Sequence, residues 1–310
     1  MKKTFSYIGL GLLAVAIFLL VTSFYSDLSV EELKRTYANS YSYSEFIEIE
    51  GTKVHYRIEG EGPPLLLLHG TASSLHTWDG WTTQLKDRFR IIRLDLPAFG
   101  LTGPSTTRDY SIEAYTKFLN AFVEKIGLER FSLAGNSLGG GIAWSFAAEF
   151  PNKVEKLILL DASGIPDDRE DPAVFKLARN PVLGKLLEFI TPKSFIKKNM
   201  KEVYFDDGKV TDELVTRYHD MALRAGNRVA FRDRARVVNP DITNKLPSIL
   251  APTLIIWGAD DQWIPVSNAT TFAERIPNAK VAIIENAGHV PMEETPVTSA
   301  NIALKFLLNP

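Results

Sequence analysis

Short apolar runs alternate with amphipathic stretches along most of the chain. Two strands of alternating polarity come first, Phe46 to Glu50 and Val54 to Ile58, and residues 51–53 between them favour a hairpin-like start. Six further runs are apolar on both faces, which is typical of buried parallel strands between helices. These runs are Pro64 to Leu68, Arg90 to Leu94, Phe131 to Ala134, Val154 to Leu160, Pro252 to Trp257 and Lys280 to Ile284. The pattern predicts an α/β fold with a mostly parallel central sheet flanked by helices.

The alternation stops at residues 163–250, where the pattern is helical throughout and prolines interrupt it. Within this region, residues 182–190 carry one apolar face. The face is formed by Val182, Leu183, Leu186, Leu187 and Ile190. We expect it to pack on the core; the alternative is that it lines a substrate pocket or touches lipid, which nearby lysines would favour. These lysines are Lys193, Lys197, Lys198 and Lys201.

The N-terminus carries a long apolar segment. Lys2 and Lys3 precede it, and no charged residue occurs from Thr4 to Ser26. About 20 apolar residues at about 1.5 Å each span the hydrocarbon core of a bilayer, so residues 1–26 are predicted to be a membrane anchor. The lysines predict a cytoplasmic N-terminus with the catalytic domain on the non-cytoplasmic side. A cleaved signal peptide, which would make the protein secreted, and a buried helix are the alternatives.

Composition narrows the class of protein. The chain has 310 residues, a formal net charge of −2 and no cysteine. One α/β domain of this size buries a large core, and the charge gives no electrostatic footprint for nucleic acid. The absence of cysteine excludes disulfides, thiolate metal sites and a lipid-modified cysteine.

Ser137 is the candidate nucleophile. It lies in the pentapeptide Gly135-Asn136-Ser137-Leu138-Gly139, between an apolar run and a helical pattern. A serine hydroxyl needs a neighbouring base and a backbone turn that exposes it. A sharp strand-to-helix turn leaves no room for side chains two residues before and after its apex, which fits Gly135 and Gly139. The spacing predicts a nucleophile elbow.

The base is expected among five histidines. His289 follows an apolar strand and lies in a loop marked by glycine and proline, where a base at a strand end belongs. His55, in an alternating strand, is expected on a solvated face. His76 and His219 fall in helical stretches with no turn around them.

A carboxylate must orient the imidazole and stabilise its charge when it takes a proton. Asp261 follows the predicted strand that ends at Trp257, and it precedes His289 in the chain. Asp260 and Asp161 also lie at strand ends, and the order of serine, acid and histidine suits all three. Asp261 is our first choice, with the other two as rivals.

Five motifs in this order resemble those of the α/β-hydrolase superfamily, over the chain from Glu45 to Leu308. They are His69-Gly70, the Asp95 to Gly100 loop, the elbow, Gly258 to Asp261 followed by Pro265, and Gly288-His289. The resemblance implies an α/β-hydrolase fold in which the helical region is a cap over the nucleophile. It divides the chain into an anchor (1–26), a linker (27–44), two parts of the hydrolase core (45–162 and 251–310) and the cap (163–250).

The resemblance also implies roles for individual residues. The pattern of glycine, aspartate and proline in the family assigns the acid to Asp261 rather than Asp260. Backbone N–H groups of Thr71 and Leu138 would form the oxyanion hole, and no metal or organic cofactor is expected. Many relatives have glycine where this chain has Ala98.

These observations predict a serine hydrolase that cleaves a lipid-like or small acyl ester, as carboxylesterases and monoacylglycerol lipases do. A carbon–carbon hydrolase of a ring-cleavage dienoate is the alternative; many such relatives have tryptophan after the histidine, where this chain has Val290. A catalytically silent binding protein is a third hypothesis. The natural substrate, processing of the N-terminus, oligomeric state and movement of the cap stay open.

Overall fold

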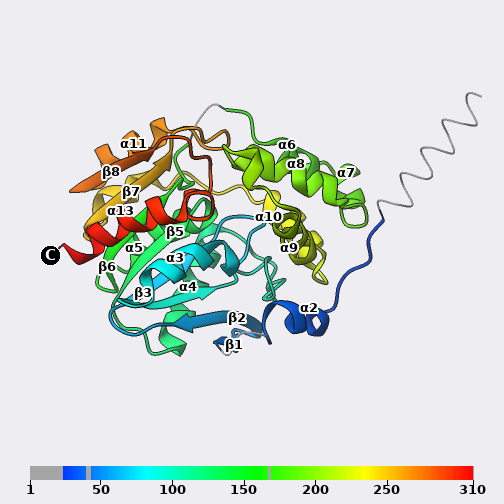
Figure 1. Cartoon of the computed structure of the whole chain (residues 1–310), viewed down its shortest axis with the longest axis horizontal. Coiled ribbons are helices and arrows are strands. Elements are labelled where there is room, and N and C mark those ends of the chain that lie inside the picture. Colours follow the sequence, from blue (N-terminus) through cyan, green and yellow to red (C-terminus); the bar gives the residue numbers. More distant parts are fainter. Residues whose placement is uncertain (1–23, 40–42, 167–168, 310) are drawn as a thin grey trace, which may run out of the picture.

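An eight-stranded sheet forms the centre of the computed structural model, which describes residues 24–39, 43–166 and 169–309 (Figure 1). The strands are β1 Ser44–Ile49, β2 Thr52–Glu59, β3 Pro64–Leu68, β4 Arg90–Leu94, β5 Phe131–Asn136, β6 Val154–Leu160, β7 Thr253–Gly258 and β8 Ala279–Ile284. Their order is β1-β2-β4-β3-β5-β6-β7-β8. The β1–β2 and β2–β4 pairs are antiparallel and the others parallel. The predicted α/β fold and its strands are confirmed.

The sheet is covered on both faces because its central strands are apolar on both faces. Successive side chains of β3 point to opposite sides, so Leu65 and Leu67 belong to one core cluster and Leu66 and Leu68 to the other. Helices α4 Ile112–Lys125, α5 Leu138–Glu149 and α11 Ser267–Arg275 contribute to one cluster. Helices α3 Asp79–Leu85 and α13 Pro296–Leu308 contribute to the other, with the short α12 Pro291–Glu294 beside them.

A group of helices lies between β6 and β7 in the sequence, where the helical region was predicted. They are α6 Ala173–Arg179, α7 Leu183–Leu186, α8 Lys193–Val203, α9 Asp212–Leu223 and α10 Asn227–Ala235. In Figure 1 they form a separate group at one end of the sheet. Met200 in α8, Val215 in α9 and Ala230 in α10 belong to the core clusters, so these helices pack onto the core at that end and can enclose a site there.

The segment ahead of β1 packs against the rest of the molecule. Helix α2 Val30–Tyr37 begins at Ser29, whose hydroxyl accepts a hydrogen bond from the Glu32 N–H, and Leu33 is buried. Leu28 donates its N–H to the Leu223 carbonyl in the cap. The stretch expected to be a linker therefore connects the core and the cap.

Across the described ranges, no helix has the length and apolar character needed to cross a bilayer. The predicted anchor falls on residues 1–26, of which 1–23 lie outside the described residues. The transmembrane helix stays a prediction.

Candidate active site

Ser137 occupies the turn between β5 and α5. Its backbone has φ 52° and ψ −117°, a strained conformation for a residue with a side chain. A Cβ atom on Gly135 would lie 2.1 Å from the Gly139 carbonyl oxygen, and one on Gly139 would lie 2.3 Å from that of Leu68. Only glycine fits at either position. The close approach explains the spacing and forms the sharp turn that the sequence predicted.

His289 and Asp261 meet at the same edge of the sheet. Asp261 follows β7 and His289 follows β8, and these neighbouring strands are parallel. Nδ1 of His289 and Oδ2 of Asp261 are 2.7 Å apart. The other oxygen, Oδ1, accepts hydrogen bonds from the Trp263 and Ile264 N–H groups at 2.7 and 3.0 Å. Asp261 is thus fixed by backbone donors on one side and turned toward the imidazole on the other.

The second imidazole nitrogen is available for chemistry. Nε2 of His289 is buried and has no hydrogen-bond partner among the described residues. His289 and Ser137 line the same cavity. With Nδ1 donating to Asp261, Nε2 carries the lone pair, so it can accept a proton from a hydroxyl within the cavity.

The rival acids differ in their surroundings. Asp260 is exposed, and its N–H donates to the Ala287 carbonyl. Asp161 is fully buried at the end of β6, and its Oδ1 accepts from the Gly258 N–H at 2.9 Å. Of the three candidates, Asp261 is the one that hydrogen-bonds to His289.

The two candidate oxyanion donors lie on either side of the turn. Leu138 is the first residue of α5, where backbone N–H groups have no partner within the helix. Thr71 follows Gly70, and a Cβ on Gly70 would come within 3.1 Å of the Ser137 Cβ. The loop after β3 therefore runs directly against Ser137.

His69 fixes that loop. Burial lowers the pKa of His69, so its ring is neutral. Its Nδ1 donates to the Gly70 carbonyl at 2.7 Å, and its Nε2 accepts from the Leu96 N–H at 2.9 Å. Ala98 lies farther along the Leu96 loop and has a φ of 85°, a conformation that glycine adopts more easily than alanine.

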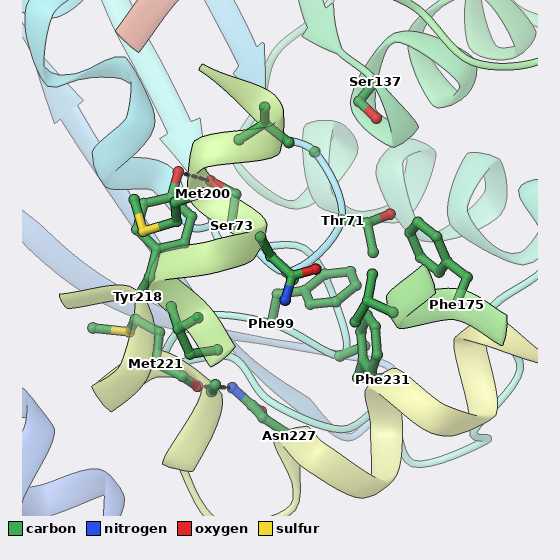
Figure 2. Close-up of a pocket in the computed structure, with 18 of the residues that line it drawn as sticks. Thr71, Ser73, Phe99, Ser137, Phe175, Met200, Tyr218, Met221, Asn227 and Phe231 are labelled. Carbon is green, nitrogen blue, oxygen red and sulfur yellow. Dashed lines mark hydrogen bonds between the residues drawn. The ribbon is translucent and has the colours of Figure 1, made fainter. Parts of the chain in front are cut away.

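The cavity beside Ser137 is enclosed mainly by apolar side chains. Its volume is about 160 Å³, compared with roughly 10–15 Å³ for one water on the same measure. The cavity therefore has room for a small organic ligand. Figure 2 shows Ser73 and Tyr218 on one side and Phe175 and Phe231 on the other. The Ser73 and Tyr218 hydroxyls are 3.2 Å apart. Tyr218 donates to Oε2 of Glu293 at 2.6 Å.

The apolar face predicted at residues 182–190 does not pack on the core as a whole. Val182, Leu183 and Leu186 are 71%, 43% and 50% exposed. Leu187 turns inward and lines the cavity. Helix α7 is only four residues long, so it cannot present one continuous face to the interior. The expectation of core packing is wrong for the exposed residues.

Sequence reasoning misplaced His55. The prediction of a solvated face is wrong, because its side chain is fully buried in β2. Nδ1 lies 2.8 Å from Oδ2 of Asp95, and Nε2 lies 2.8 Å from the Ser44 hydroxyl. The alternating pattern of β2 predicted a solvated polar face. In the structure, Phe46 and the loop that contains Asp95 pack over His55 on that face. The sequence around His55 contains no pattern that predicts its contact with Asp95.

In the described part of the chain, Asp161, Asp261 and His289 form the one group of three or more acids and histidines that each offer an oxygen or nitrogen atom within 4.8 Å of the others. Asp261 and His289 hydrogen-bond directly within it. In this contact the carboxylate fixes the orientation of the imidazole ring. The prediction that the site needs no metal or cofactor remains a prediction.

A family model of the alpha/beta hydrolase fold matches residues 63–296. The chain belongs to the alpha/beta hydrolase family. Its relatives in this family include enzymes with different substrates. A monoacylglycerol lipase of Xenopus laevis is 29% identical over 263 residues, covering 80% of this chain and 76% of the relative. A 2-hydroxy-6-oxononadienedioate/2-hydroxy-6-oxononatrienedioate hydrolase of Pseudomonas putida is 27% identical over 272 residues, covering 82% and 91%.

Among solved structures, this hydrolase is similar to a bacterial membrane phospholipase A. The two chains are 28% identical, and the TM-score is 0.73. The similarity covers 99% of this chain and 98% of the other. Lipases and carbon–carbon hydrolases are therefore both among its relatives.

Proposed function

We propose that this hydrolase cleaves carboxylic esters with a lipid-like acyl group, through Ser137, His289 and Asp261. One observation carries the proposal. The Asp261–His289 hydrogen bond leaves an unpartnered imidazole nitrogen in an apolar cavity that Ser137 also lines. A weak nucleophile, a base with an available lone pair and an orienting carboxylate are the parts that acyl transfer requires.

In the proposed first step, the Ser137 oxygen attacks the ester carbonyl while its proton passes to Nε2 of His289. Asp261 stabilises the resulting imidazolium. The N–H groups of Thr71 and Leu138 hold the oxyanion, and one such donor typically contributes about 3 kcal/mol. The proton then moves from His289 to the leaving alkoxide, which departs as an alcohol and leaves an acyl group on Ser137.

In the second step, His289 takes a proton from water, and the hydroxide attacks the acyl carbonyl. The same backbone donors hold the second oxyanion. When the intermediate collapses, the proton returns from His289 to the Ser137 oxygen and a carboxylic acid leaves. The enzyme is then restored.

The lining of the cavity supports an acyl substrate with a polar alcohol part. Phe175, Phe231 and Leu187 offer apolar surface to a hydrocarbon chain. Ser73 and Tyr218 offer hydroxyls at another wall (Figure 2). Burial and the nearby Glu293 carboxylate raise the pKa of Tyr218, so its hydroxyl stays protonated. The Tyr218 hydroxyl donates its hydrogen bond to Glu293, so its oxygen can accept a hydrogen bond from a substrate hydroxyl.

Hydrolysis of a carbon–carbon bond in a ring-cleavage dienoate is the second candidate, supported by the Pseudomonas putida relative. Such a substrate carries carboxylates, so a cationic side chain in the cavity would favour its binding. Among the described residues lining the cavity, Arg228 is the one lysine or arginine. Its Nη2 is 2.5 Å from Oδ1 of Asp27, whose carboxylate offsets the guanidinium charge, while Nε and Nη1 have no partner among the described residues. The charge distribution therefore favours the ester.

The N-terminus supports a lipid substrate. We propose that residues 1–26 anchor the enzyme in a membrane, with the catalytic domain on the non-cytoplasmic side. Phe24 and Phe189 stack with ring centroids 6.0 Å apart, and both are about half exposed. Val182, Leu183 and Leu186, on the same segment as Phe189, are also exposed apolar residues. Exposed apolar side chains of this kind suit contact with lipid.

The substrate is tested by comparing purified enzyme on p-nitrophenyl esters of increasing chain length, a monoacylglycerol and a ring-cleavage dienoate. We expect kcat/KM to rise with acyl length and the dienoate to be a poor substrate. Faster turnover of the dienoate than of every ester would contradict the proposal and favour the second candidate.

The anchor is tested separately. Full-length protein should remain with membranes in alkaline carbonate, and a chain starting at Phe24 should stay in solution while cleaving dissolved esters equally well. Its rate on bilayer-embedded lipid should fall, because tethering raises the local concentration. A mature N-terminus near Phe24, found by mass spectrometry, would indicate a secreted enzyme instead.

A further inference from the structure

Asp161 is a buried acid that the proposed mechanism does not use. It directly follows β6 and has a φ of 44°, a conformation that L residues seldom adopt. Its side chain is fully buried. Oδ1 accepts from the Gly258 N–H at 2.9 Å, whereas Oδ2 has no partner that donates a hydrogen to it among the described residues.

A second acid lies against it. Asp161, Asp261 and His289 each offer an oxygen or nitrogen within 4.8 Å of the others. Glu294 in α12 also faces this region, and its oxygens accept from the N–H groups of Gly288, Phe205 and Asp206. When two carboxylates are in contact inside a protein, the repulsion between like charges in a low dielectric favours protonation of one of them.

The hydrogen bonds decide which acid holds the proton. Asp261 accepts from two backbone N–H groups and contacts Nδ1 of His289. Asp161 accepts from one backbone N–H. Burial, followed by the Asp261 charge, raises the pKa of Asp161 well above its ordinary value, and a hydrogen bond between the two carboxyl groups acts in the same direction.

We propose that Asp161 is a positioning residue that remains protonated and donates a hydrogen bond to the Asp261 carboxylate. This inference rests on the proposed triad. The pair then carries a single negative charge, and that charge lies on the acid that contacts His289. Asp261 is held by donors from the loop after β7 and from the end of β6, so its position is fixed on two sides.

The first test compares two substitutions on a soluble p-nitrophenyl ester, with active sites counted by fluorophosphonate titration. Asp161→Asn keeps an acceptor for Gly258 and a donor for Asp261, so kcat should stay within about threefold of wild type. Asp161→Ala removes the donor and should lower kcat about 10-fold or more. It should also raise the pH midpoint of the acidic limb of kcat/KM, since an Asp261 without that donor attracts the imidazolium more strongly.

The outcomes separate three roles. If Asp161 were ionised, Asp161→Asn would remove a negative charge near His289 and lower the acidic-limb midpoint by about half a pH unit or more. If Asp161 were purely structural, Asp161→Ala would reduce the fraction of active enzyme but leave kcat per titrated site and the midpoint unchanged. Either result overturns the proposal.

The second test does not depend on activity. Urea unfolding of wild type and Asp161→Asn is compared from about pH 4 to about pH 8. In wild type the unfolded carboxyl ionises near 3.8 while the folded one keeps its proton, so stability falls as pH rises toward the folded pKa. Asparagine does not titrate. The unfolding constant of wild type relative to the variant should grow with pH, with a limiting slope of about tenfold per pH unit, until the folded Asp161 ionises. A ratio independent of pH would mean that folded Asp161 is ionised.

Failure of the proposed triad is recognised separately. It would show as full activity in Ser137→Ala, whatever the behaviour of the Asp161 variants. The unfolding experiment would still report whether Asp161 holds its proton.

Discussion

Two arrangements of serine, histidine and aspartate occur in the described ranges of the chain, and one of them lies in the cavity beside Ser137. Around His55, Nδ1 meets Asp95 and Nε2 meets the Ser44 hydroxyl, each at 2.8 Å. Around His289, Nδ1 meets Asp261 at 2.7 Å and Nε2 has no partner among the described residues. The residue types are the same, so residue type alone does not make a catalytic site.

The difference lies in how completely each group is hydrogen-bonded. Ser44 also accepts from the Arg57 guanidinium at 3.1 Å, and Asp95 accepts from the N–H groups of Leu75 and Leu101. Ser44 begins a strand with ordinary extended geometry, whereas the strained turn at Ser137 presents its hydroxyl beside a cavity. The first arrangement joins β1, β2 and the loop after β4; the second has donors and acceptors left over for a substrate.

The largest expected effect distinguishes the two serines. Ser137→Ala should lower ester turnover by about 10⁴-fold or more and abolish fluorophosphonate labelling, because the nucleophile is lost. Ser44→Ala should retain both. Residual labelling of Ser137→Ala that maps to Ser44 would show that the two arrangements are not chemically distinct.

The next effect distinguishes acids near His289. Asp261→Asn should reduce kcat by about 10⁴-fold, since the amide does not stabilise the imidazolium and favours the wrong tautomer. Asp260→Asn is the matched control and should have little effect because that side chain is exposed. Steady-state kinetics on a soluble ester measures both, and a larger loss in the control would mean that the acid is misassigned.

A smaller effect is expected on the free energy of unfolding when Asp95 is substituted. Burial alone would raise the pKa of Asp95, but the contact with His55 holds it below the ordinary value of 3.8. Its contribution is present above pH 3.8 and is lost as pH falls toward the folded pKa. Asp95→Asn should therefore destabilise the protein by about 3 kcal/mol at neutral pH and by less in acid. Urea unfolding of both proteins at several pH values checks this. A loss of stability in the variant that grows as the pH falls would contradict the prediction.

The smallest effect is on stability, where we expect the Ser44 substitution to cost more than the Ser137 substitution. Ser44→Ala should lower the free energy of unfolding by about 1 kcal/mol, because His55 and Arg57 lose a shared partner. Ser137→Ala should leave thermal unfolding nearly unchanged, since alanine keeps the Cβ that the turn already accommodates and loses only the hydroxyl. Equal losses in both variants would mean that Ser137 also has a structural role.

The sequence by itself determined the eight strands and the elbow. Strands that are apolar on both faces must be buried in a covered sheet, so Pro64–Leu68 and its neighbours were predictable from local pattern. The elbow was equally local, because Gly135 and Gly139 are required by contacts within one turn and with the adjoining strand. The order of motifs also brought Asp261 and His289 to neighbouring strand ends.

Only the tertiary structure decided which polar groups meet. His55 and Asp95 are 40 residues apart, and their contact depends on how β2 and the loop after β4 pack, which alternation in one strand does not encode. The contact between Asp161 and Asp261 likewise arises from adjacent β6 and β7. The same holds for two neighbouring leucines: Leu187 lines the cavity, whereas Leu186 is exposed to solvent. Burial, charge state and available lone pairs follow from packing between distant segments, and these are the properties that separate a reactive histidine from a structural one.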